Sequence, residues 1–151
     1  MSKIEVYEDS SVETLHKCLD LARKHYYEVE AKSSSIPFDL NMEMVGTLSE
    51  MGLLRNVVAV RDGVIVGYFA NIISPCIYTS KFVAKELGIF LLPSARGGST
   101  FYRMLKLTEN LAKEAGCYSQ MLAFKKGHDS GLAERVGYTL TETIYEKLLG
   151  D

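Results

Sequence analysis

The chain has 151 residues, of which 47% are hydrophobic, so it is long enough to bury one sizeable core and short for two domains. Its formal net charge is −2 with both signs interspersed, which gives no electrostatic footprint for nucleic acid or for an acidic membrane surface. The three cysteines, Cys18, Cys76 and Cys117, are widely spaced among apolar residues, which favours buried small side chains over a disulfide or a metal site. No apolar run approaches membrane-spanning length and the N-terminal residues contain no apolar signal core. We therefore expect one domain over residues 1–151 in a reducing cytoplasm.

The first third of the chain predicts one short strand and two helices. Residues 4–7 alternate between apolar and polar side chains, as in a short strand. Apolar residues at helical spacing predict one long amphipathic helix over residues 11–30, preceded by Ser10 and Glu13 at capping-box spacing. A second helix is predicted over residues 41–51.

Two segments rich in β-branched residues follow, residues 54–60 and 64–73. Between them stands Arg61-Asp62-Gly63, whose Asp-Gly pair is a strong signal for a tight hairpin, so the two strands should pair antiparallel. A third strand is expected over residues 84–92, whereas the intervening residues 78–82 give no clear pattern.

The C-terminal part predicts a helix over residues 99–115, a strand over 118–124, a short helix over 130–135 and a final strand over 138–148. The resulting order of elements is that of a mixed α/β fold with a parallel β-α-β crossover at its centre. In such sheets ligands bind at the carboxyl ends of the strands. The turn that follows the predicted strand 84–92 lies at that end.

This turn is the most informative stretch of the sequence. It has the sequence Leu91-Leu92-Pro93-Ser94-Ala95-Arg96-Gly97-Gly98-Ser99-Thr100. Two glycines allow the backbone to approach a ligand, and the start of a helix adds free N–H donors and the positive end of its dipole. We expect an anion such as a pyrophosphate to bind there, supported by the guanidinium of Arg96. The alternative for Arg96 is a surface arginine on a turn.

The turn, the hairpin that ends at Gly67-Tyr68 and the Gly137-Tyr138 pair together resemble the GNAT superfamily of N-acetyltransferases. The core motif of that superfamily is a strand, a proline-containing turn and an Arg-Gly-x-Gly-x-Gly/Ala loop that opens a helix. Small phage-encoded members are the most similar, judged by Tyr26-Tyr27-Glu28 and the compact tail. The resemblance covers nearly the whole chain. It implies a mostly antiparallel central sheet with a central parallel β-α-β crossover and flanking helices.

The resemblance also implies an enzyme that transfers acetyl from acetyl-CoA to an amine by direct attack, without a covalent intermediate. Its acceptor is left open between a protein lysine, an N-terminus and a small amine. The family splays the cofactor-binding strand away from the next strand, so that the thioester lies between them, and the strand edge pairs with the pantetheine arm. The implied cofactor-binding residues are Ile89, Phe90, Leu91, Arg96, Gly97, Gly98, Ser99, Thr100 and Phe101.

Three residues are candidates for proton transfer. Glu86 stands where family members often keep a carboxylate that acts as base, directly or through water; the alternative is a surface ion pair with Lys85 or Lys81. Tyr78 is a candidate acid, with packing as its alternative. His128 is a further candidate acid or cofactor contact, with an ordinary turn before a helix as its alternative.

Departures from the family motif leave other functions open. Ser99 takes the second glycine position of the loop, Phe101 takes the last small position, and Ala133 stands where the family carries the tyrosine that protonates the CoA thiolate. These residues favour an alternative hypothesis: a catalytically weak or inactive GNAT-fold protein, phage-encoded and acting in the host cytoplasm, that binds and modulates a host enzyme. A sensor of another acyl-CoA or a nucleotide is a third hypothesis. A homodimer would suit the exposed final strands of this fold.

Overall fold

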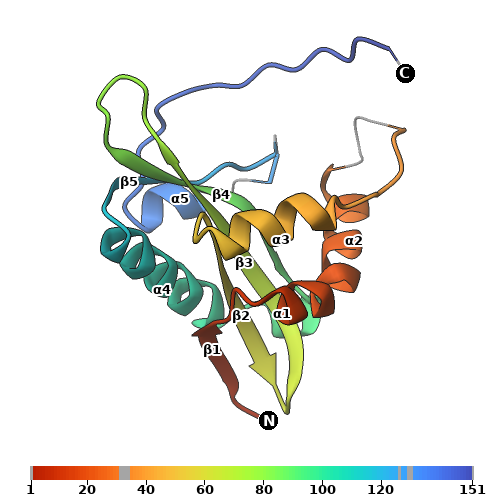
Figure 1. Cartoon of the computed structure of the whole chain (residues 1–151). Helices are drawn as coiled ribbons and strands as arrows, with labels where there is room; N and C mark the ends of the chain where they lie inside the picture. The colour runs from red at the N-terminus through yellow and green to blue at the C-terminus, as the bar shows by residue number, and fades with distance from the viewer. Residues whose placement is uncertain (1, 31–34, 126, 129–130, 151) are drawn as a thin grey trace.

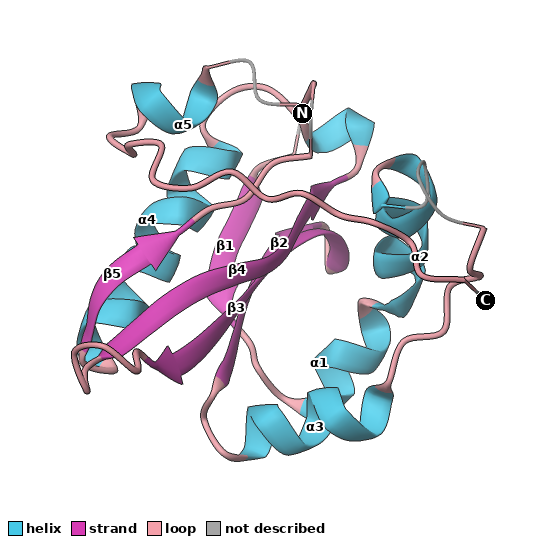
Figure 2. Ribbon diagram, turned by 90° about the horizontal axis from the view of Figure 1, so that it is seen from above, coloured by secondary structure: helices cyan, strands magenta, loops and turns pink. Residues whose placement is uncertain are grey.

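The computed structural model describes residues 2–30, 35–125, 127–128 and 131–150. Five strands form one sheet in the order β1-β2-β3-β4-β5, with helices on both faces (Figures 1 and 2). The strands are β1 (Ile4–Glu8), β2 (Leu54–Arg61), β3 (Val64–Pro75), β4 (Phe82–Leu91) and β5 (Cys117–Met121). The helices are α1 (Val12–Lys17), α2 (Leu19–Glu28), α3 (Met42–Glu50), α4 (Thr100–Glu114) and α5 (Leu132–Arg135), with a 3-10 turn at Pro93–Ala95.

The sheet is buried on both faces, because successive side chains of its central strands point to opposite sides. On one face Phe69 of β3 packs with Met104 and Leu105 of α4. On the other face Tyr68 of β3 packs with Leu21 of α2. The helices thus form two outer layers around a central sheet (Figure 2).

The predicted hairpin is confirmed. β2 and β3 pair antiparallel up to Arg61 and Val64, and the two residues between them, Asp62 and Gly63, have φ values of 52° and 77°. Positive φ at both central positions is the geometry of the tight turn that Asp-Gly favours, since its twist matches that of the flanking strands.

The predicted parallel crossover is also confirmed, and it creates an opening in the sheet. β4 runs antiparallel to β3 and parallel to β5, with α4 making the connection. The pairing of β4 with β5 extends from Phe82 and Cys117 to Lys85 and Met121, whereas β4 continues to Leu91. The second half of β4 therefore has a partner on its β3 side and an open edge on the other.

Two predictions of secondary structure are wrong. The helix expected over residues 11–30 is divided at Cys18, where ψ is −6°. Leu15, Cys18 and Leu21 are all buried, so both short helices turn an apolar side inward. The strand expected over residues 138–148 is absent: this segment lies outside every strand and α5 is followed by an extended tail. A strand needs a neighbour for its backbone groups, and none pairs with this segment.

Among the described residues, the structure has no helix long and apolar enough to span a membrane.

Replacement of Gly67 by alanine is expected to destabilise the protein by about 1–3 kcal/mol, because overpacking at a tight contact forces the backbone to shift. A Cβ atom at Gly67 would overlap Leu91 and lie 2.9 Å from the carbonyl oxygen of Phe90, on the adjacent strand β4. Urea unfolding measures the loss. Gly46→Ala is the matched control, since a Cβ there meets Val12 at an ordinary 3.7 Å and alanine favours the helix; equal losses in both variants would contradict the prediction.

Candidate active site

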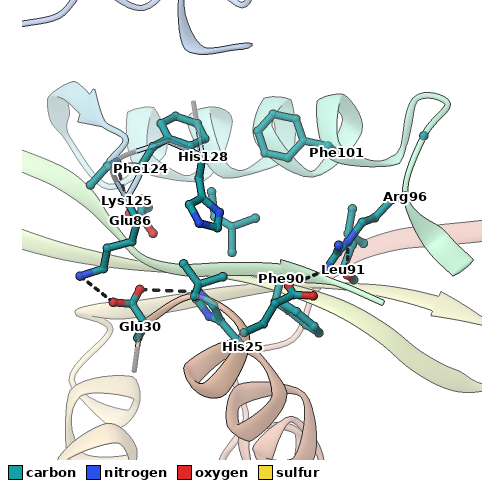
Figure 3. Close-up of a pocket in the computed structure, with 15 residues that line it drawn as sticks. His25, Glu30, Glu86, Phe90, Leu91, Arg96, Phe101, Phe124, Lys125 and His128 are labelled. Atoms are coloured by element: carbon teal, nitrogen blue, oxygen red, sulfur yellow. Dashed lines mark hydrogen bonds and ion pairs between the residues drawn. The ribbon is translucent and has the colours of Figure 1, made fainter. Parts of the chain in front are cut away.

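A cleft of about 350 Å³ opens where β4 and β5 separate (Figure 3). Its walls come from α2, the second half of β4, the turn before α4 and the segment after β5. The residues that line it are His25, Glu28, Val29, Glu30, Glu86, Ile89, Phe90, Leu91, Arg96, Gly97, Phe101, Ala123, Phe124, Lys125 and His128. The topology thus gathers residues from four distant parts of the sequence around the open edge of β4.

Glu86 lies at the point where the two strands diverge. One of its carboxylate oxygens accepts a hydrogen bond from the N–H of Ala123, at 3.2 Å. Burial raises the pKa of Glu86 to about 7, because the charged form loses water, and the Ala123 hydrogen bond only partly offsets this. No ion pair within 4 Å joins Glu86 to a described lysine, so the surface ion pair considered above is not formed. At neutral pH Glu86 is therefore divided between a form that can accept a proton and one that can donate it.

The backbone of β4 presents only alternate residues to the cleft. The N–H of Leu92 donates to the carbonyl oxygen of Val66 on the β3 side, at 2.9 Å. Since successive residues of a strand direct their backbone groups to opposite edges, those of Phe90 also point to β3, and those of Ile89 and Leu91 point to the open edge. The backbone of Phe90 thus pairs with β3, while Phe90 remains one of the residues that line the cleft.

Three contacts position Arg96, an exposed residue that lines the cleft. Its Nε donates to the carbonyl oxygen of Leu91 at 2.8 Å, and its Nη2 lies 2.9 Å from a carboxylate oxygen of Glu28. Its guanidinium carbon also lies 5.3 Å from the centre of the Phe90 ring. Arg96 thus lies exposed on a turn, and it also links the turn before α4 to the end of α2.

The turn after Arg96 has the backbone of an anion site. Gly97 and Gly98 have φ values of 90° and 62°, where a side chain would be strained. No side chain caps the first turn of α4, and the hydroxyl of Ser99 accepts instead from Nε of Arg103 at 3.2 Å. The N–H groups that open this helix therefore remain available to a ligand. Gly98, Ser99 and Thr100 lie outside the cleft lining, and Thr100 is buried.

Comparison of the sequence with family models and with curated proteins finds no match. Comparison of the structure with solved structures finds similar proteins. Ribosomal-protein-alanine N-acetyltransferase from Brucella melitensis biovar Abortus 2308 has a TM-score of 0.74 and 15% identity, over 98% of this chain and 100% of that chain. A predicted acetyltransferase from Clostridium acetobutylicum, solved with acetyl-CoA, has a TM-score of 0.76 and 14% identity over 97% of each chain. A GNAT family acetyltransferase from Staphylococcus aureus subsp. aureus USA300_TCH1516 has a TM-score of 0.66 and 16% identity, over 99% and 100%.

The chain has the GNAT acetyltransferase fold. The fold predicted from the order of elements and from the Arg-Gly-Gly turn is confirmed by these full-length matches. At such low identities the likeness establishes the fold alone.

Of the two candidate acids, one lines this cleft and one does not. His128 lines the cleft beside Lys125, on the side of β5; its neighbours Asp129 and Ser130 lie outside the described residues. Tyr78 is 94% exposed in the turn between β3 and β4 and does not line the cleft. That turn precedes β4, whereas the cleft borders the second half of β4, so Tyr78 lies away from the cleft.

His25 is a GNAT-cleft residue that sequence reasoning missed. Its ring stacks on Phe90, with 5.7 Å between ring centres, and its Nδ1 lies 2.8 Å from the hydroxyl of Tyr68. Burial lowers the pKa of His25, so the ring is neutral at pH 7, with Nδ1 accepting from Tyr68 and Nε2 facing Glu30 at 3.7 Å. Gly88 makes room for it, since a Cβ there would lie 3.3 Å from the ring. Only tertiary packing brings these residues together, so no local motif identifies His25.

Glu30 connects the two walls of the GNAT cleft. One of its oxygens lies 2.8 Å from Nζ of Lys125, and the other faces His25, as the dashed lines in Figure 3 show. Both carboxylates at the end of α2, Glu28 and Glu30, are therefore engaged by cations, whereas Glu86 pairs with no cation among the described residues. Within the described parts of the chain, no group of three or more His, Cys, Asp or Glu could hold a metal ion.

Proposed function

We propose that this protein binds acetyl-CoA in the cleft between β4 and β5 and transfers its acetyl group to an amine. The observation that carries the proposal is the arrangement along the open edge of β4. The uncapped start of α4 stands at one end of this edge, and the buried carboxylate of Glu86, which forms no ion pair with a described residue, stands at the other. The similar Clostridium acetobutylicum structure with acetyl-CoA supports the choice of cofactor.

Recognition of the cofactor would use three parts of the chain. The pyrophosphate would accept hydrogen bonds from the N–H groups around Gly97 and Gly98, with Arg96 beside it supplying positive charge. The extended pantetheine arm would pair with Ile89 and Leu91, whose backbone groups face the open edge of β4. Phe101 would contribute apolar contact from α4, since it lines the cleft.

Glu86 would serve as the base. Its carboxylate removes a proton from the incoming ammonium group, directly or through water, and the neutral amine attacks the thioester carbonyl. The new C–N bond forms as the C–S bond breaks; the acylated nitrogen releases its second proton to water, and the departing thiolate takes up a proton. His128 is the candidate donor, because the residue at position 133 is alanine and Tyr78 lies outside the cleft. The acceptor remains open between a protein N-terminus, a lysine and a small amine.

Calorimetric titration of acetyl-CoA into wild-type protein and Arg96→Ala tests the proposal. We expect binding to the wild type and an affinity at least about tenfold lower in the variant, since a charged hydrogen bond is worth about 1.5–3 kcal/mol. Arg23→Ala is the matched control, because Arg23 forms an exposed pair with Asp20 on α2, outside the cleft lining. A dephospho analogue reports on the phosphate contacts. No binding by folded wild-type protein would reject the proposed function.

One observation favours the second candidate function, a catalytically weak GNAT-fold protein that binds a host enzyme and is phage-encoded. Arg96 is already paired with Glu28, so a phosphate would compete with a carboxylate for the guanidinium. Ser99 and Phe101 take positions where the family motif has small residues, and this crowding would also weaken cofactor binding. A folded protein that neither binds acetyl-CoA nor acetylates any amine, and that retains a partner after Arg96→Ala, would support this candidate.

A further inference from the structure

A reciprocal pair of side-chain amides joins two strands that are not neighbours in the sheet. Nδ2 of Asn71 on β3 donates to Oε1 of Gln120 on β5, and Nε2 of Gln120 donates to Oδ1 of Asn71, each at 2.9 Å. The strand β4 lies between β3 and β5. The two side chains therefore form a bridge across β4, which we call the amide bridge.

The amide bridge stands where β4 and β5 separate. The pairing of these strands ends at Lys85 and Met121, one residue beyond Gln120. The second N–H of the Gln120 amide donates to the carbonyl oxygen of Met121, at 3.1 Å. Two residues farther along, the N–H of Ala123 reaches the carboxylate of Glu86. Gln120 thus anchors β5 to the sheet just before β5 leaves it.

The amide bridge lies on the same face of the sheet as Glu86. Residues opposite one another in neighbouring strands direct their side chains to the same face, and so do residues two apart along one strand. Asn71 is opposite Glu86. Gln120 is opposite Ala84, two residues before Glu86. Ala84 is fully buried and carries only a methyl group, so β4 leaves room for the two amides to meet beside Glu86.

Packing alone does not require polar side chains at these positions. Asn71 is buried, and burial of an amide costs free energy unless its hydrogen bonds are restored. Two apolar side chains of the same shape would fill this space at little or no cost in stability. Hydrogen bonds add direction, because they require defined distances and angles between donor and acceptor. The amide bridge therefore fixes how β5 is held relative to β3.

We propose that Asn71 and Gln120 are positioning residues, which fix the point where β5 leaves the sheet and thereby hold the N–H of Ala123 against the carboxylate of Glu86. The geometry is independent of catalysis, whereas its consequence for acetyl transfer rests on the proposed function. Without the amide bridge β5 separates from β4 earlier, and the hydrogen bond from Ala123 is weakened or lost. Glu86 then loses an interaction that favours its charged form.

Loss of the amide bridge should raise the pKa of Glu86 above its value of about 7. The titratable groups around Glu86 come from several elements: Glu30 and His25 at the end of α2, Tyr68 on β3, Lys85 on β4, and Lys125 and His128 after β5. Glu30 raises the pKa of Glu86, whereas Lys85 and Lys125 lower it. Of these three charges only Lys125 follows Ala123 on the same segment, and its withdrawal acts in the same direction as loss of the hydrogen bond.

Nuclear magnetic resonance of the side-chain carboxyl carbon of Glu86 tests the proposal without cofactor or substrate. The signal is assigned by its absence from Glu86→Gln. We expect Asn71→Leu/Gln120→Met to raise the midpoint of the titration by about one pH unit, the effect of one hydrogen bond to a charged group. Its stability in urea should stay close to that of the wild type, because both partners are replaced by apolar groups of similar shape.

Two further variants separate positioning from a general loss of packing. Asn71→Gln/Gln120→Asn exchanges the two amides and can keep both hydrogen bonds, so it should titrate at the wild-type midpoint. Asn56→Leu is the matched control, because Asn56 is an equally buried asparagine on β2 whose amide donates to the carbonyl oxygen of Asp9 at 3.2 Å. This control should be destabilised and yet leave the Glu86 midpoint unchanged.

An unchanged Glu86 midpoint in folded Asn71→Leu/Gln120→Met overturns the proposal, and so does an equal shift in Asn56→Leu. Kinetics distinguish this failure from failure of the proposed function. If the protein acetylates an amine, the pH of half-maximal rate should rise with the titration midpoint while the affinity for acetyl-CoA changes little. If the midpoint shifts in a protein that acetylates no amine, the role of the amide bridge is confirmed and only the proposed function is rejected.

Discussion

Replacement of Glu86 by glutamine is expected to lower the rate constant for acetyl transfer by about 100-fold or more, the usual contribution of a general base. Glutamine keeps the shape of the side chain and can still meet the N–H of Ala123, but it cannot accept a proton from an ammonium group. Steady-state kinetics with any accepted amine measures the effect. Affinity for acetyl-CoA should change little, because the proposed phosphate contacts lie at the other end of the cleft.

Activity and stability should depend on pH in opposite directions, and Glu86→Gln tests both. The raised pKa of Glu86, about 7, means that wild-type activity should increase as the pH rises through 7 and the carboxylate ionises. The free energy of unfolding should decrease over the same rise in pH. Because burial disfavours the charged form, stability is lost as the pH rises from the ordinary value of 4.5 through about 7. Glu86→Gln should remove both dependences.

Glu43→Gln provides the control, since Glu43 is exposed in the first turn of α3. It should retain full activity and the wild-type pH profile. If Glu86→Gln keeps both its rate and the inflection near pH 7, Glu86 is not the base, and the proton must leave by another route through the cleft.

Replacement of Phe69 by alanine is expected to destabilise the fold by about 3–5 kcal/mol, the usual cost of removing a large aromatic side chain from a core. Phe69 is fully buried near the middle of β3, in the cluster that joins the sheet to Met104 and Leu105 of α4. Against a total stability of about 5–15 kcal/mol for a typical domain, such a loss leaves a large unfolded fraction at moderate temperature. Urea unfolding followed by circular dichroism measures it.

Phe82→Ala is the matched control for this substitution. Phe82 begins β4 and is 44% exposed, so much less apolar surface returns to water and no closed cavity forms. It should destabilise the protein by clearly less than Phe69→Ala. Equal losses would show that the layer between β3 and α4 is not the main core of the fold.

Local chemistry explains which elements could be predicted from the sequence. The Asp62-Gly63 turn needs two residues that tolerate positive φ, and the chain supplies them where the hairpin turns. The Gly97-Gly98 turn before α4 follows the same rule. The crossover from β4 through α4 to β5 was predictable too, because helical and strand periodicity alternate clearly there.

Other features depended on contacts between distant residues. Helical spacing continues through Cys18, whereas the structure divides the helix at that residue. His25 belongs to the cleft because Gly88 and Tyr68, on two different strands, leave room for it and bond to it. Neither effect has a signature within a window of a few residues.

The sequence alone determined the order of strands and helices, the hairpin and the glycine turn, since each of these depends on neighbours along the chain. The tertiary structure decided where β4 separates from β5, which backbone groups face the cleft, and how burial raises the pKa of Glu86. It also decided the state of the C-terminal tail. Residues 138–148 have the composition of a strand, but a strand exists only where another one satisfies its backbone hydrogen bonds, and the described chain provides no such partner.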